Sequence, residues 1–338
     1  MHSLIGSENK LMTLGAFRVN FNSLDVIRGL DRSCRQLCKF MLFFCLTTVM
    51  FLGRAYASEG GGAHYPSGVN TIMNGALPAP GETMMFNYFQ YYESTRLNDS
   101  HGRSLDPDFK LNVAAWAPRF AHTWENKVGP FFLASAISLP MTRVDVRAFG
   151  RHQVSTGMGD PTLSPLLFYY VNPAGNFFAY FGPDIWVPVG EYDKDRIANN
   201  GLNYWSVSPN VMFTWLPSSR WEISGTIYSE FNAENKATNY RSGNSVTIDG
   251  AVGYRPFSDM PELKFALQGF ALKQFTDDKV DNVSIPGGNR AQAMGLGPQI
   301  SYDILGGKGG VMVKYQREFA VENRSEGNKF WVEVVFPL

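Results

Sequence analysis

The sequence KFWVEVVFPL, residues 329–338, has the alternation of a β-strand. The residues that share one face of that strand are Phe330, Val332, Val334, Phe336 and Leu338, and the other face carries Trp331, Glu333, Val335 and Pro337. A strand with a continuous apolar stripe needs a partner for its open edge. In lipid, the edge is removed by pairing with the first strand of a closed barrel. The edge strand of a soluble sandwich is the alternative that these ten residues leave open.

An exported leader is predicted at the other end of the chain, over residues 1–57. Residues 40–52 (FMLFFCLTTVMFL) form the only long apolar run. Its length suits the core of a signal peptide, about 7–15 residues, and is too short for a membrane-spanning helix of about 20. Arg32, Arg35 and Lys39 precede it, and Ala55-Tyr56-Ala57 forms a small-x-small cleavage site. We therefore expect the mature chain to begin at Ser58.

Cysteine content and charge limit what the mature chain does. All three cysteines, Cys34, Cys38 and Cys45, lie in the leader, so no disulfide or thiolate chemistry is expected afterwards. The leader holds seven of the 30 basic and three of the 30 acidic residues, which leaves 23 basic and 27 acidic residues and a net charge of −4. Such a chain lacks the basic excess of a nucleic-acid-binding protein. No nucleic-acid partner is expected.

Twelve segments after the leader alternate with the period of a strand. They are residues 84–92, 109–122, 129–141, 159–171, 177–189, 202–216, 221–232, 244–256, 261–275, 290–304, 310–320 and 329–338. Most have 9–15 residues, whereas a tilted membrane strand needs about 9–11 and soluble strands average about 5–6. The fold class predicted is an all-β, antiparallel transmembrane barrel over residues 84–338.

The connections between these segments alternate in length. The short ones are residues 123–128, 172–176, 217–220, 257–260 and 305–309, and the long ones are residues 93–108, 142–158, 190–201, 233–243, 276–289 and 321–328. Outer-membrane barrels have short periplasmic turns and longer outer loops, and an even strand count puts both ends of the barrel on the periplasmic side. The pattern therefore favours a barrel over a sandwich and predicts the Gram-negative outer membrane as its location.

Strand alternation also predicts which side chains face the lumen. In the segment 221–231, Trp221, Ile223 and Ile227 share one face, and Glu222, Tyr228 and Glu230 share the other. A basic residue that faces lipid near the midplane costs about 2–4 kcal/mol, so the polar face is expected to point inward. The lumen-facing binding candidates are Tyr180, Asp184, Trp186, Asn210, Glu222, Tyr228, Asp249, Lys264 and Gln268. They suit an amphipathic ligand, or they solvate the barrel interior.

Tryptophans near the strand ends are predicted to form the girdles at the two membrane interfaces. They are Trp124, Trp186, Trp205, Trp215, Trp221 and Trp331. Ordinary core aromatic residues are the alternative.

Several motifs resemble those of a known family. They are Gly61-Gly62-Ala63-His64-Tyr65-Pro66-Ser67-Gly68-Val69-Asn70, Leu77-Pro78-Ala79-Pro80-Gly81, Asn87-Tyr88, Tyr91-Tyr92, Pro118-Arg119-Phe120, Gly157-Met158-Gly159-Asp160-Pro161 and Pro188-Val189-Gly190-Glu191-Tyr192-Asp193. Together they are similar to the MetA-pathway of phenol degradation family, also described as SphA-like outer-membrane transporter proteins. The resemblance spans nearly all of the mature chain. It implies an outer-membrane barrel associated with uptake of aromatic or long-chain hydrophobic compounds.

The N-terminal segment 58–83 is rich in glycine and proline and lacks a strand period. It includes His64, Tyr65, Val69 and Asn70, and it is too apolar for a free tail. We expect it to fold back into the lumen as a plug, and a flexible periplasmic tether is the alternative.

Two prolines, Pro183 and Pro209, fall within neighbouring predicted strands. Each removes a ladder donor. They are expected to lie at similar height near mid-wall, where they form a lateral seam for a hydrophobic substrate or mark two local bulges.

No catalytic, metal-binding or cofactor-binding motif stands out. The mature chain has no G-x-S-x-G, H-E-x-x-H or phosphate-binding glycine motif, and its histidines are scattered. The sequence therefore predicts a non-enzymatic channel for passive uptake of small hydrophobic or aromatic compounds, with no cofactor and no metal. A non-specific or structural porin is the second hypothesis, and an outer-membrane hydrolase that uses His122 with Ser135 or Ser138 is the third. Expected partners are outer-membrane lipid, a small hydrophobic ligand and the barrel-assembly machinery, which would engage the C-terminal strand.

Overall fold

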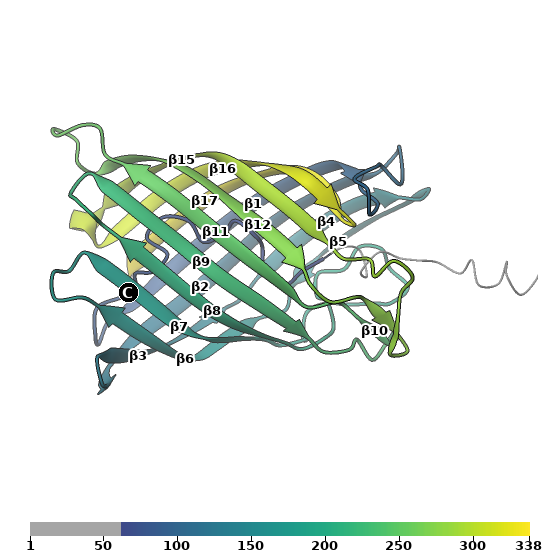
Figure 1. Cartoon of the computed structure of the whole chain (residues 1–338), viewed down its shortest axis with the longest axis horizontal. Coiled ribbons are helices and arrows are strands. Elements are labelled where there is room, and N and C mark those ends of the chain that lie inside the picture. Colours follow the sequence, from purple (N-terminus) through teal and green to yellow (C-terminus); the bar gives the residue numbers. More distant parts are fainter. Residues whose placement is uncertain (1–61) are drawn as a thin grey trace, which may run out of the picture. The chain divides into compact units, whose positions relative to one another are not determined.

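The computed structural model describes residues 62–338, and the predicted leader lies outside them. One antiparallel sheet closes on itself to form a barrel (Figure 1). Its strands are β1 (Thr83–Leu97), β2 (Lys110–Val128), β3 (Phe131–Ser138), β4 (Met141–Ala148), β5 (Arg151–Met158), β6 (Thr162–Val171), β7 (Phe177–Trp186), β8 (Ser206–Trp215), β9 (Trp221–Asn232), β11 (Ser245–Tyr254), β12 (Leu263–Gln274), β15 (Gln292–Ile304), β16 (Gly309–Glu322) and β17 (Ser325–Pro337).

These segments make twelve wall strands, as the alternation predicts. Both β3 and β4 pair with β2, so they are one wall strand interrupted at residues 139–140. Likewise, β5 and β6 continue one another across residues 159–161 and pair with β4 and β3. Proline at positions 140 and 161 supplies no N–H to the ladder, which accounts for breaks at these points.

The C-terminal strand closes the barrel. β17 pairs with β1 from Met84 opposite Pro337 to Leu97 opposite Ser325. Phe330 is 46% exposed on the outer wall, whereas Trp331 is 3% exposed and faces inward. The predicted closed barrel is confirmed, and the sandwich that the last ten residues left open is excluded.

The tryptophans divide between the two faces of the wall. Trp124, Trp205, Trp215 and Trp221 are exposed on the outside, as expected for interface residues. The interface prediction is wrong for Trp186 and Trp331, which point into the barrel. Their indole N–H groups donate to Tyr228 and Gln316 on the inner wall, a role that proximity to a strand end does not reveal.

Two predicted long loops are mostly strand. Residues 142–158 form the hairpin β4–β5, which joins through Phe149 and Gly150, both with positive φ (50° and 74°). Residues 321–328 contain only a short turn between β16 and β17, with Asn323 at φ 53°. Charged side chains on the outer face of these segments made them resemble loops. Inward apolar residues occur on β4, at Val144, Val146 and Ala148, whereas the inward positions of β5 and of residues 323–328 are polar or glycine.

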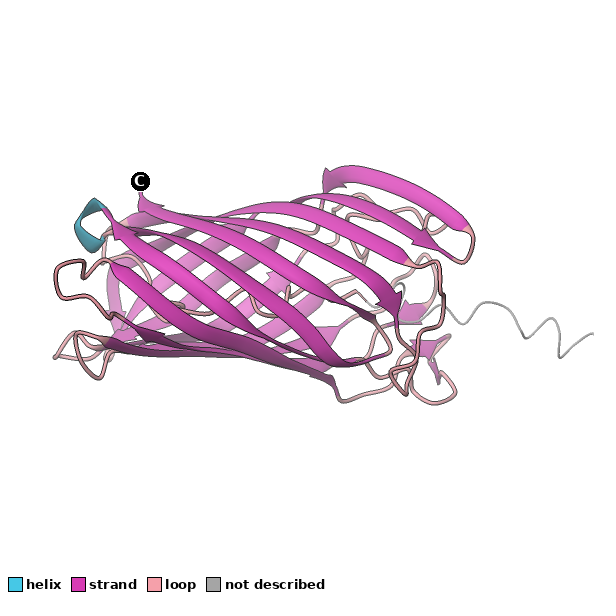
Figure 2. Cartoon of the chain, turned by 90° about the horizontal axis from the view of Figure 1, so that it is seen from above, coloured by secondary structure: helices cyan, strands magenta, loops and turns pink. Residues whose placement is uncertain are grey.

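The remaining long connections lie at one end of the barrel, together with β4, β5 and β10 (Figure 1). Two of them pair as a small sheet of β10 (Tyr240–Arg241), β13 (Lys279–Val280) and β14 (Val283–Ser284). The short turns lie at the opposite end, where η1 (Leu305–Gly307) forms the short helix visible in Figure 2. Among residues 62–338, no helix has the length and apolarity that crossing a membrane would require.

Candidate functional site

The nine lumen candidates all lie on the inner wall. Eight of them are at most 9% exposed, and these are Tyr180, Asp184, Asn210, Glu222, Tyr228, Asp249, Lys264 and Gln268. Trp186 is half-buried, and its indole N–H donates to the Tyr228 hydroxyl at 2.9 Å. The period of two therefore located the lumen side chains correctly. Their role in ligand binding remains a prediction.

Residues 62–82 lie within the barrel and bond to its inner wall. Tyr65, Val69, Ile72 and Leu77 are each at most 8% exposed. This segment forms no ladder, so its backbone groups need other partners. They find them on lumen-facing side chains of strands from β6 to β17. Whether the segment closes the passage, as a plug would, remains a prediction.

Asp249 on β11 is the main anchor for the segment. Its carboxylate accepts the Tyr65 hydroxyl at 2.5 Å and the backbone N–H groups of Gly68 at 2.9 Å and Asn70 at 3.2 Å. The Tyr65 ring stacks on Tyr228 with centroids 3.9 Å apart. The side chain of Asn70 also donates to the Tyr65 hydroxyl at 2.8 Å. One carboxylate thus fixes three successive parts of the segment.

Basic and amide side chains on the facing strands hold the segment's carbonyl groups. Lys314 on β16 donates to the carbonyl of Val69 at 2.5 Å, and Lys329 on β17 donates to that of Ser67 at 2.9 Å. Gln316 donates to the Gly68 carbonyl at 3.0 Å. A Cβ on Gly68 would lie 2.4 Å from the Gln316 side chain, and its φ is +86°, so glycine suits this position.

Acidic wall residues bind N–H groups on the other side. Glu230 on β9 accepts the N–H of Tyr65 at 3.1 Å, and Glu222 on β9 accepts that of Met73 at 2.6 Å. Glu222 also forms a buried ion pair with Lys264 on β12. The lumen therefore presents acids to the segment's donors and bases to its acceptors.

His64 joins the segment to the end of the barrel that carries the long loops. Its Nε2 lies 3.2 Å from Asp160, and its Nδ1 lies 3.0 Å from Ser206 Oγ and 3.6 Å from Glu230. Trp186 stacks on the His64 ring at 5.1 Å. Burial alone would lower the pKa of His64, but hydrogen bonds and charge attraction from Asp160 and Glu230 outweigh it and raise the pKa above its usual value.

Asp160 makes this contact part of a larger junction. Its carboxylate accepts the backbone N–H groups of Gly190 at 2.9 Å and Leu202 at 2.6 Å, both in the connection 187–205. The same side chain thus holds the break between β5 and β6, the connection after β7 and the N-terminal segment.

The raised pKa of His64 predicts that docking of the segment weakens as pH rises. A group whose pKa is higher in the docked state stabilises that state fully below its ordinary pKa, near 6.5, and loses the effect as pH passes the raised value. Hydrogen–deuterium exchange around residue 64, corrected for the intrinsic rate, should therefore show less protection at pH 9 than at pH 6. His64→Gln should remove this dependence, and an unchanged slope in the variant would contradict the assignment.

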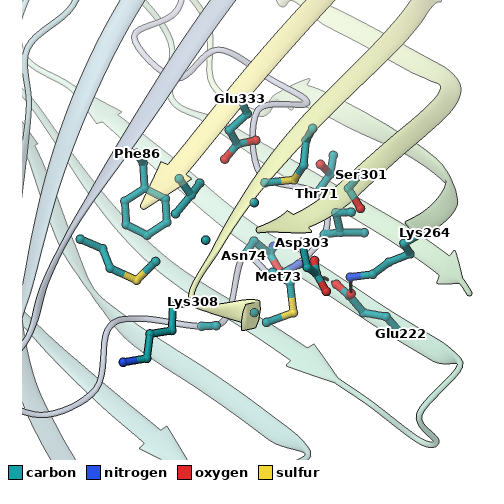
Figure 3. A pocket seen from close by; sticks show the side chains of 18 of the residues that line it. Thr71, Met73, Asn74, Phe86, Glu222, Lys264, Ser301, Asp303, Lys308 and Glu333 are labelled. Atoms are coloured by element: carbon teal, nitrogen blue, oxygen red, sulfur yellow. Dashed lines mark hydrogen bonds and ion pairs between the residues drawn. The ribbon is translucent and has the colours of Figure 1, made fainter. Parts of the chain in front are cut away.

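A cavity of about 440 Å³ lies between the segment and the short-turn end of the barrel. Its apolar lining includes Ile72, Met73, Leu77, Met84, Phe86 and Met312, and its polar lining includes Arg119, Glu222, Lys264, Ser301, Asp303 and Glu333. Figure 3 shows Phe86 and Glu333 on one side and the Glu222–Lys264 pair on the other. Turn residues such as Ser218 and Lys308 form its rim. The cavity suits a small molecule with an apolar body and a polar group.

Only part of the lining of this cavity was predicted from the sequence. Glu222 and Lys264 are the predicted lumen residues that line it. The apolar lining was missed because Ile72 and Met73 belong to a segment without period. Met84 and Phe86 start the first strand, where the inward face is apolar instead of polar. The two adjacent methionines, Met84 and Met85, are the available signal, since methionine suits adaptable binding surfaces.

Pro183 and Pro209 lie directly opposite one another in β7 and β8. The register therefore confirms the prediction that the two prolines lie at similar height in the wall. A further proline, Pro165 on β6, lies where the register shifts against both β3 and β7. Neither ladder partner at the Pro183–Pro209 pair supplies an N–H. A seam that opens there remains a prediction.

Comparison with known proteins yields a family and a fold. The family described as Putative MetA-pathway of phenol degradation matches residues 94–334. The COG4313 outer membrane channel from Pseudomonas putida F1 is similar in structure, with a TM-score of 0.68 and 19% identity over 78% of this chain and 97% of that one. No curated protein matches the sequence.

Two autotransporter barrels are less similar to this chain in structure than the COG4313 channel is. The β domain of Bordetella Brka has a TM-score of 0.44 and 10% identity over 77% of this chain and 100% of that one. The transport unit of AIDA-I from Escherichia coli also has a TM-score of 0.44, with 9% identity over 75% of this chain and 89% of that one.

Proposed function

Since the chain belongs to the Putative MetA-pathway of phenol degradation family, we propose that it is an outer-membrane channel for passive uptake of small hydrophobic or aromatic compounds. The observation that carries this proposal is the cavity beside residues 62–82. Its lining combines methionines and Phe86 with the Glu222–Lys264 ion pair and with single polar groups such as Glu333. A ligand with a ring or short chain and one polar group fits such a lining. The similar solved structure is itself an outer membrane channel.

In this proposal, residues 62–82 act as the plug. His64, Tyr65, Val69 and Asn70 hold it across the lumen through Asp160, Glu230, Asp249 and Lys314. Of the nine inner-wall candidates, Trp186, Glu222, Tyr228 and Asp249 then contact the plug. Glu222 and Lys264 face the ligand. A cleaved leader directs export, and the barrel-assembly machinery engages β17. Lipid surrounds the outer wall, where large apolar side chains are exposed on all sides.

A general porin is the weaker alternative because buried side chains and the segment occupy the lumen between the cavity and the outer loops. An enzyme is weaker still. His122 Nδ1 pairs with Thr83 Oγ1 at 2.9 Å, and the Ser135 hydroxyl donates to the Pro165 carbonyl at 2.8 Å, so neither bonds to the other. We propose no catalytic residue.

Single-channel conductance of the mature chain in a planar bilayer tests this proposal, beside a version lacking residues 58–81. The intact chain is expected to be almost silent, and the shortened chain is expected to show large, steady openings because the lumen side chains lose their occupant. Large openings from both would favour a general porin. Silence from both would mean that the wall itself fills the lumen, and passage through it would lose its physical basis.

The proline pair tests a sideways exit into the membrane. Replacing Pro183 and Pro209 with valine restores two N–H donors to the β7–β8 ladder. If substrate leaves through this seam, uptake of a hydrophobic compound into vesicles should slow at least about threefold while conductance after removal of residues 58–81 stays unchanged. Equal uptake in both proteins would show that the prolines only shape the wall.

A further inference from the structure

The hairpin β4–β5 and the adjoining part of β2 form a small sheet with two unlike faces. Its inner face is covered, because Val146 and Ala148 pack in a cluster with Ala198 of the connection 187–205 and with Leu97 and Phe109. Its outer face carries exposed Lys110, Arg143, Arg147 and His152. Asp145 is the one acidic residue on that face within these strands.

The register places these side chains in rows. The lowest row is apolar and joins Phe89, Trp116, Met141 and Met158 across four strands, each between 38% and 52% exposed. Two residues further out along the strands, Arg143 lies between Ala114 and Thr156. Six residues out from the apolar row, Arg147 lies between Lys110 and His152. The apolar row marks where the wall leaves the hydrocarbon.

The outermost row sets like charges side by side. Lys110 and Arg147 are directly opposite in antiparallel strands, an arrangement that destabilises a sheet. Within residues 62–338, neither side chain has a hydrogen bond or ion pair. His152 pairs with Asp145 at 3.0 Å, and Arg143 donates to Thr156 Oγ1 at 3.3 Å, so the nearby acid does not neutralise the row. An anion that bridges Lys110 and Arg147 would relieve the repulsion.

The height of the rows identifies the kind of anion. At about 3.4 Å per residue and a tilt of about 45°, Arg143 lies about 5 Å and Arg147 about 14 Å above the apolar row. The first height is that of headgroup phosphates, and the second is that of phosphorylated sugars attached to an outer-leaflet glycolipid. Arginine binds phosphate oxygens with two parallel hydrogen bonds. The continuous apolar row below offers contact to acyl chains, which a soluble acidic protein would not use.

We propose that this outer face, made of Lys110, Arg143, Arg147 and His152, binds the phosphate groups of an outer-leaflet glycolipid. The acyl chains of the same lipid lie against Trp116, Met141 and Met158. This inference rests on the outer-membrane location but is independent of what passes through the lumen. The bound lipid screens the repulsion between Lys110 and Arg147 and holds the hairpin at a fixed height above the membrane.

Lipid binding to the full mature chain in detergent tests the proposal. The probes are rough lipopolysaccharide with its phosphates and the same lipid after enzymatic dephosphorylation, measured by native mass spectrometry. The double variant Lys110→Glu, Arg147→Glu should bind the phosphorylated lipid at least about tenfold more weakly than the unaltered chain. Lys194→Glu, Lys236→Glu makes the same charge change at exposed loop positions and should bind normally.

Each other outcome decides against the proposal. Equal binding by the unaltered chain and the Lys110–Arg147 variant would overturn it, as would equal binding of the dephosphorylated lipid. Competition by millimolar inorganic phosphate alone would show a free-anion site instead of a lipid site. Heat-modifiable migration on gels verifies that each variant is folded, and Lys110→Gln, Arg147→Gln gives a milder change if the reversal prevents folding. Conductance of the lumen is not involved, so the result is separate from the test of uptake.

Discussion

Asp249→Ala is expected to turn an almost silent barrel into one that opens frequently. The substitution removes the acceptor for the Tyr65 hydroxyl and for the N–H groups of Gly68 and Asn70. A hydrogen bond to a charged group contributes about 1.5–3 kcal/mol, so losing three should cost the docked state at least about 3 kcal/mol. Since about 1.4 kcal/mol corresponds to a factor of ten, the ratio of docked to undocked segment should fall more than 100-fold.

Single-channel recording measures this directly as the fraction of time spent in large openings. Asp193→Ala is the matched control, because this carboxylate lies in the connection 187–205 at 47% exposure and bonds to Arg196 and to the N–H of Asp195 in the same loop. The control should remain as quiet as the unaltered chain. An Asp249→Ala barrel that is equally quiet would show that the basic wall alone holds the segment, and the anchor role of Asp249 would be refuted.

The second large effect is expected at the buried pair of Lys264 and Glu222. Both side chains are 2% exposed, and Glu222 also accepts the N–H of Met73. Removing one partner of a buried ion pair costs about 3–5 kcal/mol, because the other charge stays buried and uncompensated. Lys264→Met should therefore lower the free energy of unfolding by about that amount, measured by urea titration in lipid vesicles with tryptophan fluorescence.

A double variant separates the cost of the stranded charge from loss of packing. Lys264→Met with Glu222→Gln removes both charges and keeps an acceptor for Met73, so most of the lost stability should return. If the double variant is no more stable than Lys264→Met, the penalty lies in the shape of the lysine side chain and the electrostatic explanation is wrong.

Period-two patterns predicted the wall of this protein well, since each side chain in a barrel strand has only two possible directions. Lys264 and Asp249 illustrate this, because each is charged at an inward position next to an exposed apolar residue, Phe265 and Ile248 respectively. Trp331 shows where a rule based on position along the strand fails to predict the environment of a side chain. An aromatic residue near a strand end suits the membrane interface or the lumen equally well, and here the phase of the strand decides for the lumen.

The candidate site was harder to predict because a segment without a period makes half of it. Ile72 and Met73 line the cavity through a path set by wall side chains distant in sequence. No local rule connects Met73 with Glu222, which follows 149 residues later. The hairpin β4–β5 was missed for a different reason. Its outer face is charged, so the alternation looked like a polar loop.

The side chains that hold the backbone of residues 62–82 favour one chain direction. Glu230, Asp249 and Glu222 accept N–H groups, whereas Lys314 and Lys329 meet carbonyl oxygens. A peptide threaded in the opposite orientation would present carbonyls to carboxylates and N–H groups to ammonium ions. The barrel therefore distinguishes the two directions of one backbone. A synthetic copy of residues 62–81 is expected to dock, whereas a peptide with the same residues in reversed order can match either the backbone direction or the side-chain positions but not both, and it is expected to dock more weakly.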